Sequence, residues 1–312
     1  MAPSLTIFSS PKPFDDAFIA TIQRNAIGSW KYLGSEVEVM LIGDEVGMTQ
    51  AAQDLGVRHL KGVEKNEQGT PLISSIFSMA EQEASHSLLA YVNTDILLLD
   101  DFLPGIQRSA ERFGRFIVIG QRWDLDFDSA LTFESGWANA IRKQLEASGS
   151  LHPLAGSDYF VYPRGQFATL PPFALGRAGW DNWMIFNARR LRIPVIDASR
   201  SITLIHQNHD YRHLKGGEPH YRLPESYRNV ELGGGPETVF TLVDANWRLN
   251  GQGLRRTRMS ESGLRRWAEA AAISRLGTGR RLRLVHFLFH PVETARWLGA
   301  MALRRAARGA GG

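Results

Sequence analysis

The chain contains no cysteine among its 312 residues, which excludes disulfide bonds, thiolate metal sites and cysteine nucleophiles. It also lacks any stretch of the roughly 18 apolar residues that a membrane-spanning helix needs, because charged residues or glycine interrupt its longest apolar runs. Residues 1–14 lack the basic segment and the long apolar segment of a secretory signal. Together these absences predict a cytoplasmic protein.

Acidic residues are scarce at the end of the chain. Residues 251–312 contain 13 arginines, no lysine and three glutamates, a net charge of +10, so the rest of the chain carries −6 of the total of +4. Arginine and large apolar residues mix at 280–289 and 297–305, which favours peripheral contact with the inner face of a membrane over nucleic acid, because no nucleic-acid recognition motif is present. The alternative is that this tail packs on the body and exposes its arginines to water.

Short apolar runs alternate with segments of helical periodicity in the first half of the chain. Strands are predicted at residues 5–8, 37–42, 57–60, 88–92 and 116–119, and helices at 15–33, from 51, at 71–82 and from 103. This alternation predicts an α/β fold whose mostly parallel sheet has helices on both faces. The second half is less regular, with a flexible loop expected at 232–238. We expect one domain at 1–250 and an Arg-rich helical extension at 251–312.

Polar residues follow three of the predicted strands. They are Ser9, Ser10 and Pro11, then Gly43 and Asp44, then Asn93, Thr94 and Asp95. Ligands bind beyond the carboxyl ends of parallel strands, so we expect these groups to converge on one ligand. In an extended segment Asn93 and Asp95 point to the same side, where their oxygens could bind Mg²⁺ or Mn²⁺. The alternative is a simple turn, which this sequence also favours.

Three further motifs in the second half carry polar and aromatic side chains. Gly156, Ser157 and Asp158 suit hydrogen bonds to sugar hydroxyls or phosphate, although they could equally form a β-turn before a strand. Trp180, Asp181 and Asn182 combine an aromatic face with a carboxylate that could remove a proton, and they also suit the start of a helix. His206 and His209 are candidate ligands for a transition metal, or hydrogen-bonded surface groups.

The order of these motifs resembles that of the GT-A superfamily of nucleotide-sugar glycosyltransferases. Members have a strand-end DxD, a glycine-containing loop on the acceptor side, an acidic xED segment at a helix start and a late histidine. The matching pieces are residues 93–95, 156–158 and 180–182, with His206 or His209 as the late histidine. The resemblance covers roughly residues 5–215. Two of these segments depart from the family pattern. Residues 93–95 read NTD in place of DxD, and residues 180–182 read WDN in place of xED.

The resemblance implies a GT-A-type, Rossmann-like fold and transfer of a sugar from a nucleotide-diphosphate donor, UDP being favoured, to a hydroxyl of a glycan or lipid-linked acceptor with Mn²⁺ or Mg²⁺. The implied donor contacts are Ser9, Ser10, Pro11, Arg24, Asp44, Asn93 and Asp95. The implied substrate contacts are Gly156, Ser157, Asp158, Trp180 and Asn182. Asp95, His206 and His209 would bind the metal, and Asp181 would be the catalytic base.

Three other classes of protein remain as alternatives. A nucleotidyltransferase would need a glycine-rich loop after its first strand, and residues 9–13 contain no glycine. An inactive module that binds sugar nucleotides or glycans is supported by the two departures from the family pattern. A metal-dependent hydrolase could use His206, His209 and Asp210, but it would need more His and Asp pairs near the early strand ends.

Overall fold

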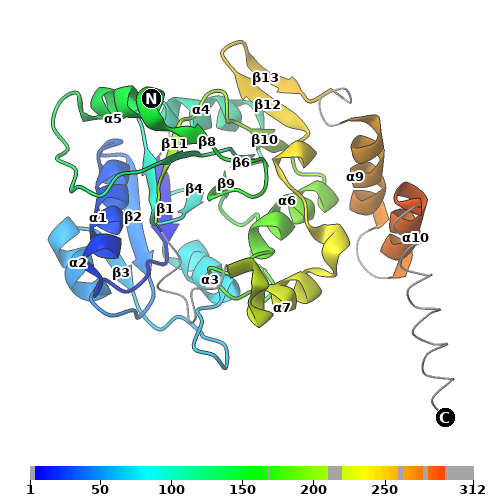
Figure 1. Ribbon diagram of the computed structural model, residues 1–312, viewed down its shortest axis with the longest axis horizontal. Coiled ribbons are helices and arrows are strands. Elements are labelled where there is room, and N and C mark those ends of the chain that lie inside the picture. Colours follow the sequence, from blue (N-terminus) through cyan, green and yellow to red (C-terminus); the bar gives the residue numbers. More distant parts are fainter. Residues whose placement is uncertain (1–3, 168, 210–219, 259–262, 277–279, 292–312) are drawn as a thin grey trace.

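The computed structural model of the chain describes residues 4–167, 169–209, 220–258, 263–276 and 280–291 (Figure 1). Most of the described chain forms one α/β body, and helices α9 and α10 lie beside it. Within the described residues, no helix has the length and apolar character to cross a bilayer.

The centre of the body is a nine-stranded sheet with the order β3-β2-β1-β4-β9-β6-β10-β12-β13. Its strands are β1 (Leu5–Ser9), β2 (Val37–Ile42), β3 (Arg58–Leu60), β4 (Leu88–Val92), β6 (Ile117–Ile119), β9 (Tyr159–Pro163), β10 (Val195–Asp197), β12 (Trp247–Asn250) and β13 (Gly253–Arg256). Neighbours pair in parallel except at β9, which is antiparallel to β4 and β6, and at the β12–β13 hairpin. The prediction of a mostly parallel α/β sheet is therefore confirmed.

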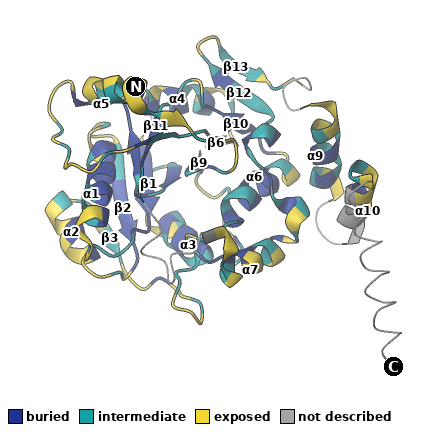
Figure 2. Ribbon diagram, viewed as in Figure 1, coloured by how far each residue is buried: buried dark blue, intermediate teal, exposed yellow. Residues whose placement is uncertain are grey.

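Helices cover both faces of this sheet, as the alternation of side chains along each strand requires. Ile7 packs on the face that also holds Trp30, whereas the next residue, Phe8, packs on the opposite face against Phe77. The first face is covered by α1 (Ala17–Lys31), α2 (Met48–Leu55) and α4 (Phe102–Arg112). The second is covered by α3 (Ile73–Glu83) and α6 (Trp180–Arg190). Figure 2 shows the strands buried between these two layers.

A second sheet, which the sequence analysis did not predict, stands beside the first. Its order is β5-β11-β7-β8, formed by β5 (Ile96–Leu98), β11 (Leu204–Gln207), β7 (Trp123–Leu125) and β8 (Ser150–Leu151). Helix α5 (Trp137–Ser148) packs on its apolar side chains. Strand β5 follows β4 after residues 93–95, so that this short connection joins the two sheets. Polar side chains at the junction are therefore presented to the same space.

The C-terminal part differs from the sequence expectation in two places. The loop expected at 232–238 is largely helical, because α7 (Pro224–Gly233) extends into it and Pro236–Thr238 is a 3-10 helix. The boundary expected at residue 251 falls within the hairpin that joins β12 to β13, two strands of the large sheet. Helix α9 (Leu264–Leu276) buries Ala270 and Ile273 in the same core as α6, and α10 (Arg280–Phe289) packs on α9.

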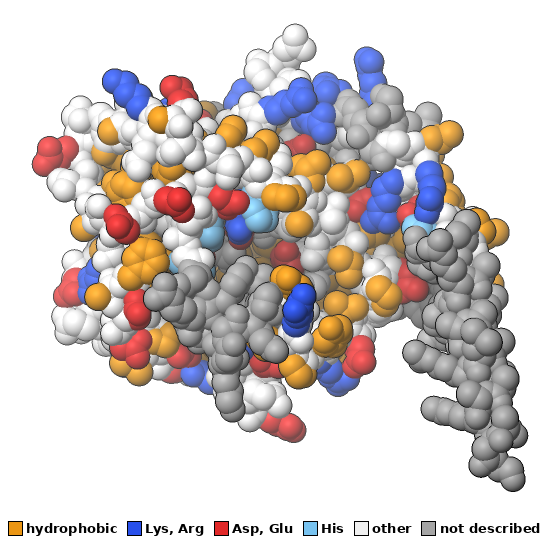
Figure 3. Space-filling view, in the orientation of Figure 1, with side chains coloured by type: hydrophobic (Ala, Val, Ile, Leu, Met, Phe, Trp, Pro, Cys, Tyr) orange, Lys and Arg blue, Asp and Glu red, His pale blue; other side chains and the backbone are white. Residues whose placement is uncertain are grey.

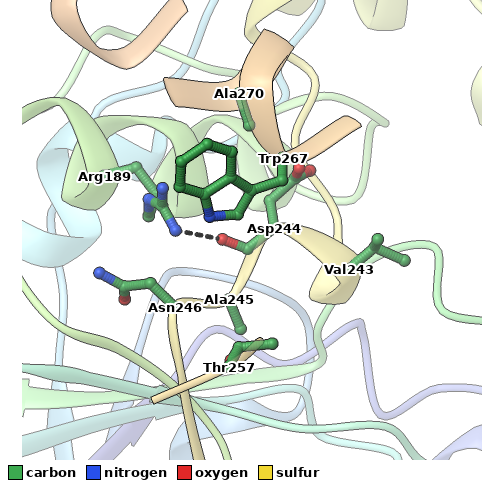
Figure 4. Close-up of a pocket in the computed structure, with 8 residues that line it drawn as sticks. All are labelled: Arg189, Val243, Asp244, Ala245, Asn246, Thr257, Trp267 and Ala270. Carbon is green, nitrogen blue, oxygen red and sulfur yellow. Dashed lines mark hydrogen bonds between the residues drawn. The ribbon is translucent and has the colours of Figure 1, made fainter. Parts of the chain in front are cut away.

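Asp244 connects α6 and α9, and Figure 4 shows its contact with α6 beneath two side chains of α9. Arg189 of α6 donates to the main-chain oxygen of Asp244 at 2.8 Å, and Trp267 and Ala270 of α9 close the small cavity above this contact. Arg266 of α9 forms two hydrogen bonds of 2.8 Å to the buried Asp244 carboxylate. The first helix of the basic extension is thus built into the body.

Candidate functional site

Three side chains that could bind one metal ion meet at the junction of the two sheets. Asp95, His206 and His209 each offer a ligand atom, and these atoms lie within 4.8 Å of one another. The Oδ2 atom of Asp95 is 3.1 Å from His209 Nε2 and 3.7 Å from His206 Nε2. The other oxygen, Oδ1, is buried and has no hydrogen-bond partner in the described part of the chain. One carboxylate and two imidazoles suit Mn²⁺, and an unsatisfied buried carboxylate oxygen is the group a cation would satisfy.

The local fold explains why these residues meet. The chain turns after β4, where Ile96 N donates to Asn93 O at 3.1 Å, so the turn expected as an alternative does form. Gln207 N then donates to the main-chain oxygen of Asp95 at 3.0 Å. In the second sheet His206 stands opposite Ile96 on one side and Asp124 on the other. Strand register, not sequence proximity, therefore brings His206 to Asp95.

A second carboxylate, Asp124, lies behind His206. Its Oδ1 is 3.4 Å from His206 Nδ1, and it is itself held by Arg122 Nε at 2.9 Å and His152 Nδ1 at 2.7 Å. A carboxylate behind a ligand histidine fixes the ring orientation and strengthens the other nitrogen as a ligand. Burial lowers the pKa of His206, but the Asp95 and Asp124 carboxylates outweigh it and leave that pKa raised. The sequence analysis missed Asp124.

The charge of the cluster keeps Asp95 ionised. Burial alone would raise the pKa of Asp95, but attraction to His206, His209 and Lys12 holds it well below its ordinary value. An ionised carboxylate is the form that binds a cation. The Asp95 site is therefore prepared for a positive charge.

Lys12 is a second site residue that the sequence analysis missed. Its Nζ atom lies 3.3 Å from His209 Nε2. Its main chain is held on both sides by Gln23 of α1, which accepts from Lys12 N at 2.7 Å and donates to Lys12 O at 3.0 Å. Thr94 donates to the same Gln23 side chain at 3.1 Å, which ties Lys12 to the turn that carries Asp95. The only signal in the sequence was a lysine directly after the first strand-end group.

Asn93 belongs to a different set of contacts from Asp95. Its Nδ2 donates to Asp158 Oδ1 at 2.9 Å, and its Oδ1 accepts from the Tyr91 hydroxyl at 3.0 Å. The antiparallel pairing of β4 with β9 sets Asn93 opposite Asp158, and Arg122 Nη1 completes the contacts of Asp158 at 2.9 Å. Both ends of the Asn93 amide are therefore engaged away from the Asp95 carboxylate.

Asp181, in the first turn of α6, is a carboxylate whose pKa is raised, whereas that of Asp95 is lowered. Burial, with a contribution from Asp158 and opposition from main-chain amides at the helix start, raises the pKa of Asp181 to about 6. A methyl group in place of the Gly156 hydrogen would put its carbon 2.1 Å from Asp181 Oδ2, so the carboxylate approaches the main chain only because residue 156 is glycine. The pKa of Tyr91 is raised by burial and then by Asp95, Asp158 and Asp181 together. All three carboxylates therefore act electrostatically on one buried hydroxyl.

Three residues expected in the site make contacts elsewhere in the described structure, and for Trp180 burial corrects the expected sugar contact. Trp180 is 5% exposed and packs edge-on against Tyr91 at 5.1 Å between ring centroids, so its face is not open to a sugar. Arg24 forms a half-exposed ion pair with Asp54 at 3.1 Å. The Asp44 carboxylate accepts from the main-chain amides of Gly62 and Val63 at 3.1 Å and shapes that loop.

The remaining expected residues support the site from its edges. Ser9 donates to Val92 O and joins β1 to β4, while the buried Ser10 hydroxyl has no partner in the described part of the chain. Ser157 donates to Tyr159 O at 2.9 Å, and Asn182 donates to Ala155 O at 3.0 Å. Pro11 is buried two residues after the end of β1. Asp210, which the hydrolase alternative would need, lies outside the described residues.

Figure 3 shows histidine, basic and acidic side chains gathered near the middle of one face of the molecule. Two pockets lie elsewhere in the described structure, one beneath α9 and one lined by Gly165, Phe167 and Trp183, and their linings contain no histidine and no acidic residue except Asp244, which is bound to Arg266.

The sequence matches no protein-family model and no curated protein. Among solved structures, glucosyl-3-phosphoglycerate synthase from Mycobacterium tuberculosis in complex with Mn²⁺, UDP and phosphoglyceric acid is 13% identical, with a TM-score of 0.45 over 84% of this chain and 79% of that chain. A mannosyltransferase from Pyrobaculum calidifontis in complex with GDP-Man and Mn²⁺ is 12% identical, with a TM-score of 0.41 over 66% of this chain and 57% of that chain.

Proposed function

We propose that this chain is a metal-dependent glycosyltransferase of the GT-A type, which transfers a sugar from a nucleotide-diphosphate donor to an acceptor hydroxyl. The observation that carries the proposal is the presence of two carboxylate sites of opposite character, both of which influence the buried Tyr91 hydroxyl. One is the Asp95, His206 and His209 cluster at the end of β4, and the other is the Asp181 carboxylate at the start of α6. A cation site beside a carboxylate of raised pKa suits displacement of a phosphate leaving group by a hydroxyl.

Asp95, His206 and His209 would hold Mn²⁺ or Mg²⁺, which would act as a Lewis acid and neutralise charge on the departing diphosphate. The protein prepares this place by keeping Asp95 ionised and by setting His206 against Asp124. The buried Ser10 hydroxyl, directly after β1, would hydrogen-bond the nucleotide. UDP is the donor nucleotide that the resemblance favours.

Asp181 would remove the proton of the acceptor hydroxyl if the sugar is transferred with inversion. With a pKa of about 6, its carboxylate is mostly ionised at neutral pH and still basic enough to accept a proton. Asp158, held by Asn93 and Arg122, would bind a hydroxyl of the transferred sugar or of the acceptor. If the configuration is retained, Asp181 would only orient the substrate.

A thermal-shift panel of nucleoside diphosphates and nucleotide sugars, with and without Mn²⁺ or Mg²⁺, tests the donor site. A ligand that binds only the folded chain raises the melting temperature by mass action. We expect one nucleotide to stabilise the wild type only with metal, and Asp95→Ala to abolish this shift. The control is Asp54→Ala, which removes a carboxylate from an exposed ion pair and should leave the shift intact. No nucleotide-dependent shift under any metal condition would disprove the proposal.

Product analysis separates the alternatives. A glycosyltransferase releases a nucleoside diphosphate and a glycoside, whereas a nucleotidyltransferase releases pyrophosphate. An inactive module would show the metal-dependent thermal shift but release neither product with any acceptor. A hydrolase would release free sugar in the absence of an acceptor.

We also propose that the C-terminal helices bring the enzyme to an anionic membrane that carries a lipid-linked acceptor. Leu284 and Leu288 of α10 are 61% and 78% exposed and lie one helical turn apart, beside the exposed Phe287. Residues 251–312 carry a net charge of +10. Apolar anchors with basic charge favour an anionic bilayer surface.

Sedimentation with vesicles tests this contact. The wild type should bind vesicles that contain phosphatidylglycerol and not vesicles of phosphatidylcholine alone, and Leu284→Ser with Leu288→Ser should weaken binding. The control, Val46→Ser, removes an apolar side chain that is 65% exposed near the start of α2. Equal sedimentation with both kinds of vesicle, or none with either, would contradict the proposal.

A further inference from the structure

Lys12 holds a position in the cluster that the proposed chemistry does not yet explain. Its Nζ atom lies 3.3 Å from the Nε2 atom of His209, a candidate metal ligand. It also attracts Asp95, the carboxylate at the centre of the cluster. The ammonium group therefore uses the same nitrogen and the same negative charge that a divalent cation would use.

The Nε2 atom of His209 cannot contact the Lys12 ammonium and bind a metal ion at the same time. A metal ion bound to His209 Nε2 would replace the contacts that this nitrogen makes with Asp95 Oδ2 at 3.1 Å and with Lys12 Nζ at 3.3 Å, because an imidazole nitrogen that binds a metal uses its only lone pair and carries no proton. Two cations beside the same buried carboxylate would also repel each other strongly, because the surroundings screen charge poorly. Binding of a metal at Asp95 and His209 therefore requires the Lys12 ammonium to move away.

The main chain of Lys12 is held in place, so a displaced ammonium would move by rotation of the side chain alone. Gln23 is 1% exposed and fixes both the amide and the carbonyl of Lys12. The four-carbon side chain beyond this anchor is flexible, and its ammonium is a mobile point charge. Because Lys12 follows β1, it stands on the edge of the sheet where the donor diphosphate is expected.

We propose that the Lys12 ammonium is a resident counter-ion of the metal centre, which a divalent cation displaces and which then binds the donor diphosphate. The part concerning the diphosphate rests on the proposed glycosyltransferase function. The consequence is coupling between ligands: the metal alone binds weakly because it must expel Lys12, and the nucleotide provides the expelled ammonium with a new anionic partner. Metal and nucleotide therefore bind more tightly together than separately.

Calorimetric titration of the full-length chain with MnCl₂ alone tests the displacement. Lys12→Met removes the charge and keeps most of the side-chain volume, and we expect it to bind Mn²⁺ about tenfold more tightly than the wild type. Lys12→Arg keeps the charge and should bind Mn²⁺ as weakly as the wild type. The matched control is Lys65→Met, which removes a lysine paired with Glu45 at 2.8 Å outside the cluster and should change nothing. Melting curves confirm that each variant is folded.

Titration with UDP at saturating Mn²⁺ tests the second role. Lys12→Met should bind UDP about tenfold more weakly than the wild type, so that the effects on metal and on nucleotide have opposite signs. Loss of general site structure would weaken both. Mn²⁺ affinity that is unchanged or lower in folded Lys12→Met overturns the proposal.

The outcomes also separate this proposal from the proposed function. If Mn²⁺ affinity rises in Lys12→Met but no nucleoside diphosphate binds any variant, the displacement stands and the glycosyltransferase function fails. If UDP binds with metal but Lys12→Met leaves both affinities unchanged, the function stands and the role of Lys12 fails. If no variant binds Mn²⁺, with or without UDP, both proposals fail.

Discussion

Asp95 at the end of β4 and Asp181 at the start of α6 are both sheltered carboxylates that act on Tyr91, yet their pKa values move in opposite directions. Burial raises the pKa of each. Around Asp95, two imidazoles and an ammonium outweigh burial, whereas Asp181 faces another carboxylate and keeps the raised value of about 6. Neighbouring charge, not depth, therefore decides which carboxylate binds a cation and which can carry a proton.

The largest expected effect comes from removing the negative charge at the first of these sites. Asp95→Asn keeps the shape of the side chain but leaves His206, His209 and Lys12 without their shared counter-ion. We expect glycosyl transfer to fall by about 10³-fold, since charge stabilisation of the leaving group is lost. Initial rates at several Mn²⁺ concentrations measure this, with Asp54→Asn as the control. A rate within a few-fold of wild type would remove Asp95 from the metal centre.

Asp181→Asn should separate activity from stability. Loss of the base should lower kcat by about 10²- to 10³-fold. The pKa of Asp181 is higher in the folded chain than in the unfolded chain, so the wild type loses stability as pH rises from about 4 to about 6 and the carboxyl group ionises. The amide of Asp181→Asn does not ionise, so at neutral pH this variant should be more stable than the wild type by about 1 to 3 kcal/mol. Melting at pH 7 and at pH 4 measures this, and the gain should disappear at pH 4. A lower melting temperature at pH 7 would contradict the assigned pKa.

The wild-type pH profile follows from the same carboxylate. The base acts when ionised, so kcat/KM should decline as pH falls through about 6 and level off above about 7. Metal affinity measured in parallel over the same range identifies any loss that arises at the histidines instead. A profile that stays flat from pH 5 to pH 8 at saturating metal would exclude Asp181 as the base.

Asp124→Asn tests the support behind the metal centre. The amide keeps a hydrogen-bonding oxygen but loses the charge that orients His206, so Mn²⁺ affinity should fall by about 10- to 100-fold. Asp128→Asn is the matched control, because Asp128 lies four residues further on, is exposed, and accepts a hydrogen bond from the neighbouring Ser129 rather than from a residue that contacts His206. If both variants bind Mn²⁺ as the wild type does, His206 does not depend on Asp124.

The sequence predicted the parts of this site that local patterns reveal. Asp95 follows a predicted apolar strand, and His206 follows a β-branched run and lies near a second histidine, so both residues stood out in the sequence. Asp124 did not, because β7 has only three residues and its apolar and acidic side chains alternate without a buried run. Lys12 and His209 are 197 residues apart in sequence, and they meet because β1 pairs with β4 in one sheet and β11 pairs with β5 in the other. Such contacts depend on register, which a single sequence does not display.

Trp180 shows a different limit of the sequence, which marked this residue but did not decide between two roles for it. An aromatic residue beside a carboxylate at a helix start fits a sugar platform and a core position equally well in sequence. The structure decides for the core, because Tyr91, Phe77 and Phe160 surround the ring. The pattern located the start of α6 and its carboxylate, but it could not say which face of the helix meets the sheet.

The smallest expected effect concerns the glycine that lets Asp181 reach its place. Gly156→Ala would set a methyl carbon 2.1 Å from Asp181 Oδ2, so the carboxylate must shift. We expect kcat to fall by about tenfold, because a displaced base loses alignment with the acceptor, and the free energy of unfolding to fall by about 1 to 3 kcal/mol. Gly114→Ala, where an added methyl group meets nothing within 4 Å, is the control. In Gly156→Ala combined with Asp181→Asn the kinetic losses should not add, since both act through one carboxylate; additive losses would mean that Gly156 serves the substrate directly.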